Sequence, residues 1–128
     1  MANPISREIR TGTIGELLVQ LRLLQFNVQA AAPLKDSGND LIACFGEVFK
    51  TIQVKTTTSN KKPPQKPKDS IKYNILAIVR LSGYDETIHF DKSKIYLVPK
   101  HELTSVNYSW KGLESYLLST KLVNKIFA

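Results

Sequence analysis

The apolar and polar positions of the chain predict a helix near its start. Five apolar residues recur at spacings of three and four and so share one helical face: Ile14, Leu17, Leu18, Leu21 and Leu24. Two starting points are open. The segment 13–16 fits a capping box, whereas a start at Ser6 would place Arg7 and Arg10 on the first turns. Asn27 follows the last periodic residue, where a left-handed cap is expected.

Short apolar runs separated by turn residues predict a series of strands after this helix. We expect extended segments over residues 28–32, 40–45, 48–55 and 71–81, then one or two strands over 87–90 and 94–98. Gly46 and Glu47 have the Gly-X chemistry of a tight two-residue hairpin turn. The continuous apolar run 75–79 is typical of a buried strand. Helical spacing of apolar residues predicts a second helix over about 110–127.

Length and composition assign these elements to a single domain covering residues 1–128. Residues 56–70 are rich in Lys, Pro, Ser and Thr and offer no apolar residue for a core, so we expect a mobile loop. Cys44 is the one cysteine, which excludes an internal disulfide. The chain begins without an apolar signal segment, and its longest apolar run is too short to cross a bilayer. We therefore expect a cytoplasmic protein.

A net charge of +7 favours an anionic partner, of which nucleic acid is the commonest inside cells. An anionic membrane surface or an acidic protein would also be attracted. Eight basic residues are candidates for phosphate contacts: Arg7, Arg10, Lys35, Lys61, Lys62, Lys66, Lys68 and Lys72. The lysine- and proline-rich loop can be a DNA-contacting arm or a plain exposed connection.

The hairpin register places polar side chains together at one edge of the sheet. With a two-residue turn, Phe45 faces Val48, and Asp40 is then predicted directly opposite Gln53. Opposed residues in an antiparallel pair have Cβ atoms about 5 Å apart. Lys55 is two residues beyond Gln53 and therefore projects from the same face of the strand.

These residue types suit a magnesium site beside a phosphodiester, with Mn²⁺ as an alternative ion. Asp40 would be a direct ligand, with the Gln53 amide oxygen and the Val54 backbone carbonyl as further oxygens. Glu16, on the first helix, could hold the ion through a water molecule. Lys55 would orient the attacking water or stabilise negative charge as it develops.

Three short motifs resemble those of the PD-(D/E)XK nuclease superfamily, which includes Holliday-junction resolvases, restriction endonucleases and homing endonucleases. They are Gly15-Glu16, Gly38-Asn39-Asp40 and Gln53-Val54-Lys55, within about residues 7–58. The resemblance implies an α/β restriction-endonuclease-like core, in which a central mixed β-sheet is flanked by helices. It also implies magnesium-dependent DNA cleavage by a homodimer or higher homo-oligomer, with Glu16, Asp40, Gln53 and Lys55 as the catalytic residues.

The chain departs from the family pattern at two positions. Asn39 stands where the pattern has proline, and Gln53 stands where it usually has an acid, as in some members with glutamine. A non-catalytic nucleic-acid-binding module on the same fold is therefore the alternative. An assembly subunit that uses the C-terminal helix as its contact face is a third hypothesis. The substrate is open among branched junctions, specific duplex sites and damaged ends.

Overall fold

A computed structural model describes residues 5–34 and 39–128. Helix α1 (Arg7–Gln25) comes first and helix α2 (Thr120–Ile126) last. Within the described residues, the strands between them are β1 (Gln29–Ala31), β2 (Leu41–Phe45), β3 (Val48–Thr57), β4 (Ile75–Ser82) and β5 (His89–Pro99). No helix in this part of the chain has the length and apolar character needed to cross a membrane.

The strands form one sheet in the order β1-β2-β3-β4-β5. The β3–β4 pair is parallel and the other neighbouring pairs are antiparallel, so the sheet is mixed. This confirms the predicted α/β class with a central mixed sheet.

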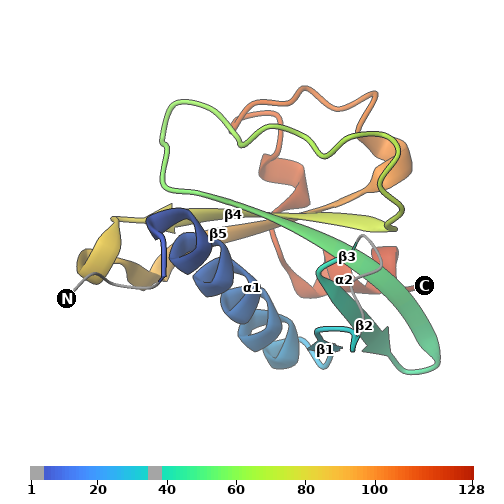
Figure 1. Cartoon of the computed structure of the whole chain (residues 1–128). Helices are drawn as coiled ribbons and strands as arrows, with labels where there is room; N and C mark the ends of the chain where they lie inside the picture. Colours follow the sequence, from blue (N-terminus) through green and yellow to red (C-terminus); the bar gives the residue numbers. More distant parts are fainter. Residues whose placement is uncertain (1–4, 35–38) are drawn as a thin grey trace.

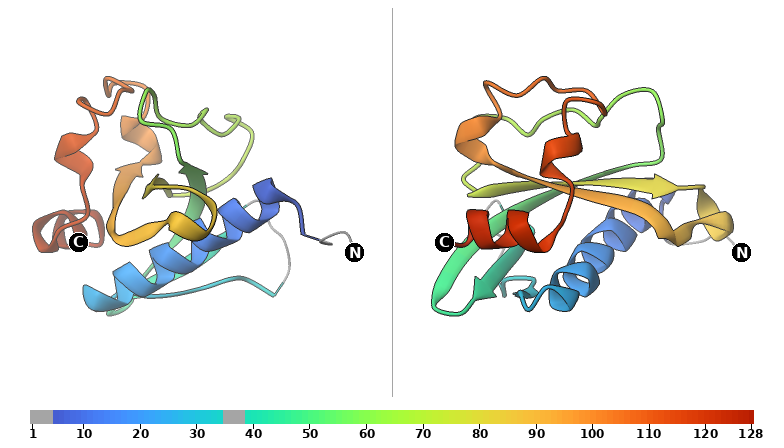
Figure 2. Two further views of the ribbon diagram at one scale, coloured as in Figure 1. Left: turned by 90° about the vertical axis from the view of Figure 1, so that its left-hand side faces the viewer. Right: turned by 180° about the vertical axis from the view of Figure 1, so that it is seen from behind.

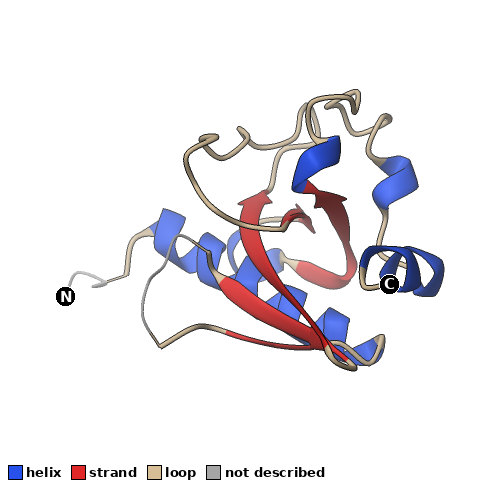
Figure 3. Cartoon of the chain, turned by 90° about the vertical axis from the view of Figure 1, so that its right-hand side faces the viewer, coloured by secondary structure: helices blue, strands red, loops and turns tan. Residues whose placement is uncertain are grey.

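Both helices cover the same face of the sheet (Figures 1 and 2). There, Leu23 of α1 and Val123 of α2 are buried in one core with Ile52 and Val54 of β3. The opposite face is covered by the long connections around residues 58–74 and 100–118, which appear as loops above the sheet in Figure 3. Trp110 is buried in this second core. As predicted, β4 is a buried strand.

Helix α1 begins at the earlier of the two predicted positions. The Ile9 N–H donates to the Ser6 hydroxyl oxygen at 3.2 Å, so Ser6 is the N-cap. A start at residues 13–16 is therefore wrong. Asn27 has a φ of 66°, which confirms the predicted left-handed cap.

The five apolar residues that share a face of α1 do not all pack on the sheet. The helix buries Gly15, Leu18, Val19 and Leu23 against the sheet. In contrast, Leu17, Leu21 and Leu24 are 58%, 60% and 59% exposed. The helix has apolar residues on two sides, and the side that contains Gly15 packs on the sheet.

The β2–β3 hairpin has the predicted register. Phe45 pairs with Val48 and Leu41 pairs with Ile52. Gly46 has a φ of +61°, a conformation that glycine adopts without strain, as the tight turn requires. Farther along the chain, residues 89–99 form one strand with an irregularity opposite Arg80 and Ser82, rather than two separate strands.

The long C-terminal helix predicted over residues 110–127 is wrong, because α2 covers only its last part. The Leu122 N–H donates to the Ser119 hydroxyl at 3.1 Å, and this cap begins the helix. Before it, the Leu118 N–H donates to the Ile95 carbonyl at 2.9 Å, so the chain runs beside β5. This extended contact with the sheet replaces the expected helical turns.

The lysine- and proline-rich connection between β3 and β4 contacts the protein at several points. Pro63 and Pro67 are buried, although the sequence offers no other apolar residue there. The Tyr108 hydroxyl donates to the Pro64 carbonyl at 2.6 Å, and burial raises the pKa of Tyr108 to about 12. Lys66 donates to the Leu103 carbonyl at 3.2 Å. The mobility of this segment stays a prediction.

Candidate active site

Asp40 lies alongside Gln53 at the end of the β2–β3 ladder. Its N–H donates to the Ile52 carbonyl at 3.0 Å, and its Oδ2 accepts from the Val54 N–H at 2.8 Å. These two partners are the residues immediately before and after Gln53. The strand itself begins at Leu41, so Asp40 precedes β2 instead of opening it as expected.

Close contact between α1 and β3 positions Glu16. A Cβ atom at Gly15 would lie 1.8 Å from the Thr56 Oγ1, so only glycine lets the helix approach this closely. Glu16 follows on the helix and lies in the electrostatic range of Asp40. Burial, and to a smaller extent the negative charge of Asp40, raise the pKa of Glu16. The structure thus brings two carboxylates from distant segments into mutual repulsion.

Gln53 and Lys55 alternate with the buried core residues Ile52 and Val54, so they share the other face of β3, as predicted. The Oε1 atom of Gln53 is buried and has no hydrogen-bond partner among the described residues. A buried acceptor without a donor costs about 1–3 kcal/mol, which a bound cation would recover. Lys55 is half-buried, and no salt bridge joins it to an acid in the described part of the chain.

A cleft of about 400 Å³ lies between the first half of α1 and the end of β3. Glu16, Val54 and Lys55 line it together with Gly12. Asp40 contacts this wall through its hydrogen bond to Val54. The cleft therefore joins two of the four predicted catalytic side chains directly, and the other two lie next to Val54.

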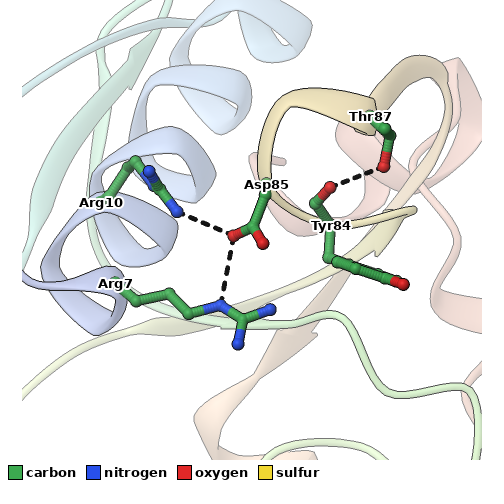
Figure 4. Close-up of polar contacts among 5 residues, drawn as sticks. All are labelled: Arg7, Arg10, Tyr84, Asp85 and Thr87. Atoms are coloured by element: carbon green, nitrogen blue, oxygen red, sulfur yellow. Dashed lines mark hydrogen bonds and ion pairs between the residues drawn. The ribbon is translucent and has the colours of Figure 1, made fainter.

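Two arginines of α1 converge on one acid beside this cleft (Figure 4). Arg7 and Arg10 lie 3.2 Å and 2.7 Å from the Asp85 Oδ1, and Arg7 also lies over the Tyr84 ring at 5.9 Å. Arg7, Tyr84 and Asp85 all line the cleft. The sequence alone does not indicate the contact of Tyr84 and Asp85 with α1, because no local pattern reports a partner so distant along the chain.

The predicted basic residues of the long connection are all exposed: Lys61, Lys62, Lys66, Lys68 and Lys72. Lys62 and Lys66 line a second hollow of about 660 Å³ with Tyr108. Thr57 lines both this hollow and the cleft that contains Glu16, so the two adjoin. Lys35 lies outside the described residues.

The comparisons with known proteins bear on the fold. No protein-family model and no curated protein matches the chain. The fold is similar to that of a bacterial homing endonuclease, I-Ssp6803I. The TM-score is 0.65 with 14% sequence identity, and the match covers 95% of this chain and 94% of that chain. At this identity, the similarity establishes a shared fold, and the PD-(D/E)XK motif assignment stays a prediction.

The oxygen atoms of the site fit a divalent cation. Asp40 and Glu16 supply two carboxylates that repel one another, and Gln53 supplies a buried oxygen to which no described residue donates. In a strand the N–H and C=O of one residue point to the same side, so the Val54 carbonyl faces the Asp40 side. No group of three or more His, Cys, Asp or Glu side chains gathers within residues 5–34 and 39–128. Any ion here would therefore depend on the neutral oxygens as well.

The repulsion between Glu16 and Asp40 makes a prediction about stability. Glu16→Gln is expected to raise the melting temperature at pH 7 by about 2 °C, since it removes a charge that burial and Asp40 both oppose. The pKa of Glu16 is higher in the fold than its ordinary value of 4.5, so the wild-type chain loses stability as pH rises through the raised value. The gain should therefore vanish below about pH 4, where Glu16 is protonated in both states.

Circular dichroism melts from pH 3.5 to 7.5 measure this difference. Glu8→Gln is the matched control, because Glu8 is an exposed acid of the same helix that also lines the cleft. It should not raise the melting temperature, because Glu8 lies in the first turn of α1, where a negative charge is favourable. An equal melting temperature for Glu16→Gln and wild type at pH 7 would show that neither burial nor Asp40 penalises the charged form of Glu16.

Proposed function

We propose that the protein is a metal-dependent DNA endonuclease that hydrolyses phosphodiester bonds with Glu16, Asp40, Gln53 and Lys55. One observation carries the proposal: Asp40 forms hydrogen bonds with the residues immediately before and after Gln53, and the charge of Asp40 acts on Glu16. The fold that holds this arrangement is similar to that of a homing endonuclease.

Mg²⁺, or Mn²⁺ in its place, would supply charge neutralisation at the phosphate and lower the pKa of a nearby water. Asp40, the Gln53 Oε1 and the Val54 carbonyl would hold the ion, with Glu16 in its outer shell. Lys55 lines the same cleft and has no acid partner in the described part of the chain. It is therefore available to orient the attacking water and to stabilise negative charge on the phosphate oxygens.

The DNA backbone would bind along the cleft and the adjoining lysine-lined hollow. Arg7 contributes at the cleft, Arg10 lies beside it, and Lys62 and Lys66 line the hollow. Such cations bind phosphates and position a duplex without reading its sequence. Cleavage of both strands needs two sites, so we include a homodimer or higher homo-oligomer in the proposal.

Cleavage of supercoiled plasmid and of a four-way junction tests the function. With Mg²⁺, purified protein should convert the plasmid to nicked or linear forms, and EDTA should stop this conversion. The absence of cutting with both Mg²⁺ and Mn²⁺ on all of these substrates would overturn the proposal.

A non-catalytic nucleic-acid-binding module is the second candidate, and Gln53 in place of an acid favours it. One negative charge fewer weakens the attraction for a divalent ion. Calorimetry separates the two candidates, because the binding module would show salt-sensitive DNA affinity without heat from Mg²⁺ or Mn²⁺.

A further inference from the structure

Helix α1 carries an exposed apolar row on the side away from the sheet. The row consists of Ile14, Leu17, Leu21 and Leu24, at successive spacings of three, four and three. Its three leucines are each more than half exposed. Phe90 of β5 is 54% exposed and, together with Ile14, Leu17 and Leu21, lines an apolar groove of about 190 Å³ beside the row.

The row has the spacing of a coiled-coil seam, in which apolar residues alternate at intervals of three and four. Helix α1 packs other residues against the sheet and leaves this apolar row exposed to water. Charged residues between positions 14 and 24 are Glu16, which lines the cleft, and Arg22, which bonds Gln25. At 3.6 residues per turn, both lie on other sides of the helix, so uncharged Thr13 and Gln20 flank the row.

The charge distribution points to a second copy of this chain as the occupant. DNA would need cations on this surface, and the row itself carries none: the basic residues in line with it, Arg7 and Arg10, lie beyond its N-terminal end and share Asp85 at 3.2 Å and 2.7 Å. Two copies with a net charge of +7 repel one another, so a contact between them needs a face without unpaired cations. The apolar row satisfies this condition, because its flanking side chains are neutral.

We propose that α1 pairs with α1 of a second copy through Leu17, Leu21 and Leu24, with Phe90 at the edge. A two-fold contact applies the same surface on both copies, which a straight row of leucines can provide. From the exposed fractions of the four side chains we estimate an apolar patch of roughly 300–400 Å², the order of the apolar centre of a standard interface of about 800 Å² per partner. None of the four residues lines the cleft, so the pairing uses no side chain of the proposed active site.

Sedimentation equilibrium over about 5–200 μM chain tests the pairing. Wild type should have twice the chain mass, and the double variant Leu17→Glu, Leu21→Glu should self-associate at least about 100-fold more weakly, because it places like charges at the centre of the contact. Phe49→Glu is the matched control, since Phe49 is 68% exposed on β3 and outside the groove. It should keep the wild-type mass. Circular dichroism confirms that all three proteins are folded.

Monomeric wild type across this range would overturn the inference, as would a double variant that associates like wild type. An equal loss of association in Phe49→Glu would also overturn it. The inference extends the proposed two-site assembly, but it fails separately from the proposed chemistry. A monomer that cuts DNA would overturn the pairing and support the nuclease function. A dimer that does not cut DNA would support the pairing and overturn the nuclease function.

Discussion

Asp40→Asn is expected to slow DNA cleavage by at least about 10³-fold with little loss of stability. The substitution removes the negative charge that would hold the cation. The asparagine side-chain oxygen can still accept from the Val54 N–H, a bond that Asp40 makes at 2.8 Å. Initial rates of plasmid nicking, together with melting temperatures, measure the two effects.

Comparison with Asp40→Ala separates the charge from the backbone contact. Alanine removes the acceptor as well and leaves the Val54 N–H unpaired, which should cost about 1–3 kcal/mol of unfolding free energy. Both variants should cut equally poorly, although only the alanine variant loses stability. Asp69→Asn, at an exposed acid outside the cleft, should cut like wild type. Wild-type cutting by Asp40→Asn would show that the site assignment is wrong.

The positions in the hairpin follow from the sequence because two local signals agree. Gly46 fixes a two-residue turn, and alternation of apolar residues fixes the face of each strand. Gln53 was therefore placed correctly beside Asp40. The hydrogen bond from the Val54 N–H to the Asp40 carboxylate was not predictable, because it depends on where the paired ladder ends.

The packed face of α1 was not predictable because the helix carries two apolar sides. Spacing alone favours Leu17, Leu21 and Leu24, yet those leucines are exposed. The choice is made in three dimensions by the fit of Gly15 against Thr56. The prediction of a long C-terminal helix was wrong for a related reason. Leu113 and Leu122 both belong to the apolar series that predicted the helix, but they are buried in different cores on opposite faces of the sheet.

The Gly15–Thr56 contact predicts opposite effects for two neighbouring glycines of α1. Gly15→Ala should lower the unfolding free energy by about 2 kcal/mol, because its Cβ would lie 1.8 Å from the Thr56 Oγ1. Gly12→Ala should raise it by about 0.5–1 kcal/mol, because no atom of the described residues lies within 4 Å of the added Cβ. Both substitutions gain the same helix propensity, so the difference between them in urea unfolding measures the packing. Equal stability of the two variants would contradict the close approach of α1 to β3.

Activity should follow the same contact, because the approach of α1 to β3 also positions Glu16. If Gly15→Ala displaces the helix by about 1 Å, cleavage should fall by up to about 10²-fold even where the protein remains folded. Adding Thr56→Ala removes two of the three clashing atoms, but Thr56 Cβ would still lie 2.8 Å from the new methyl group. The double variant should therefore recover stability and cutting only in part. Full recovery would mean that the Thr56 side chain alone opposes a larger residue at Gly15, whereas no recovery would place the conflict in the backbone of β3.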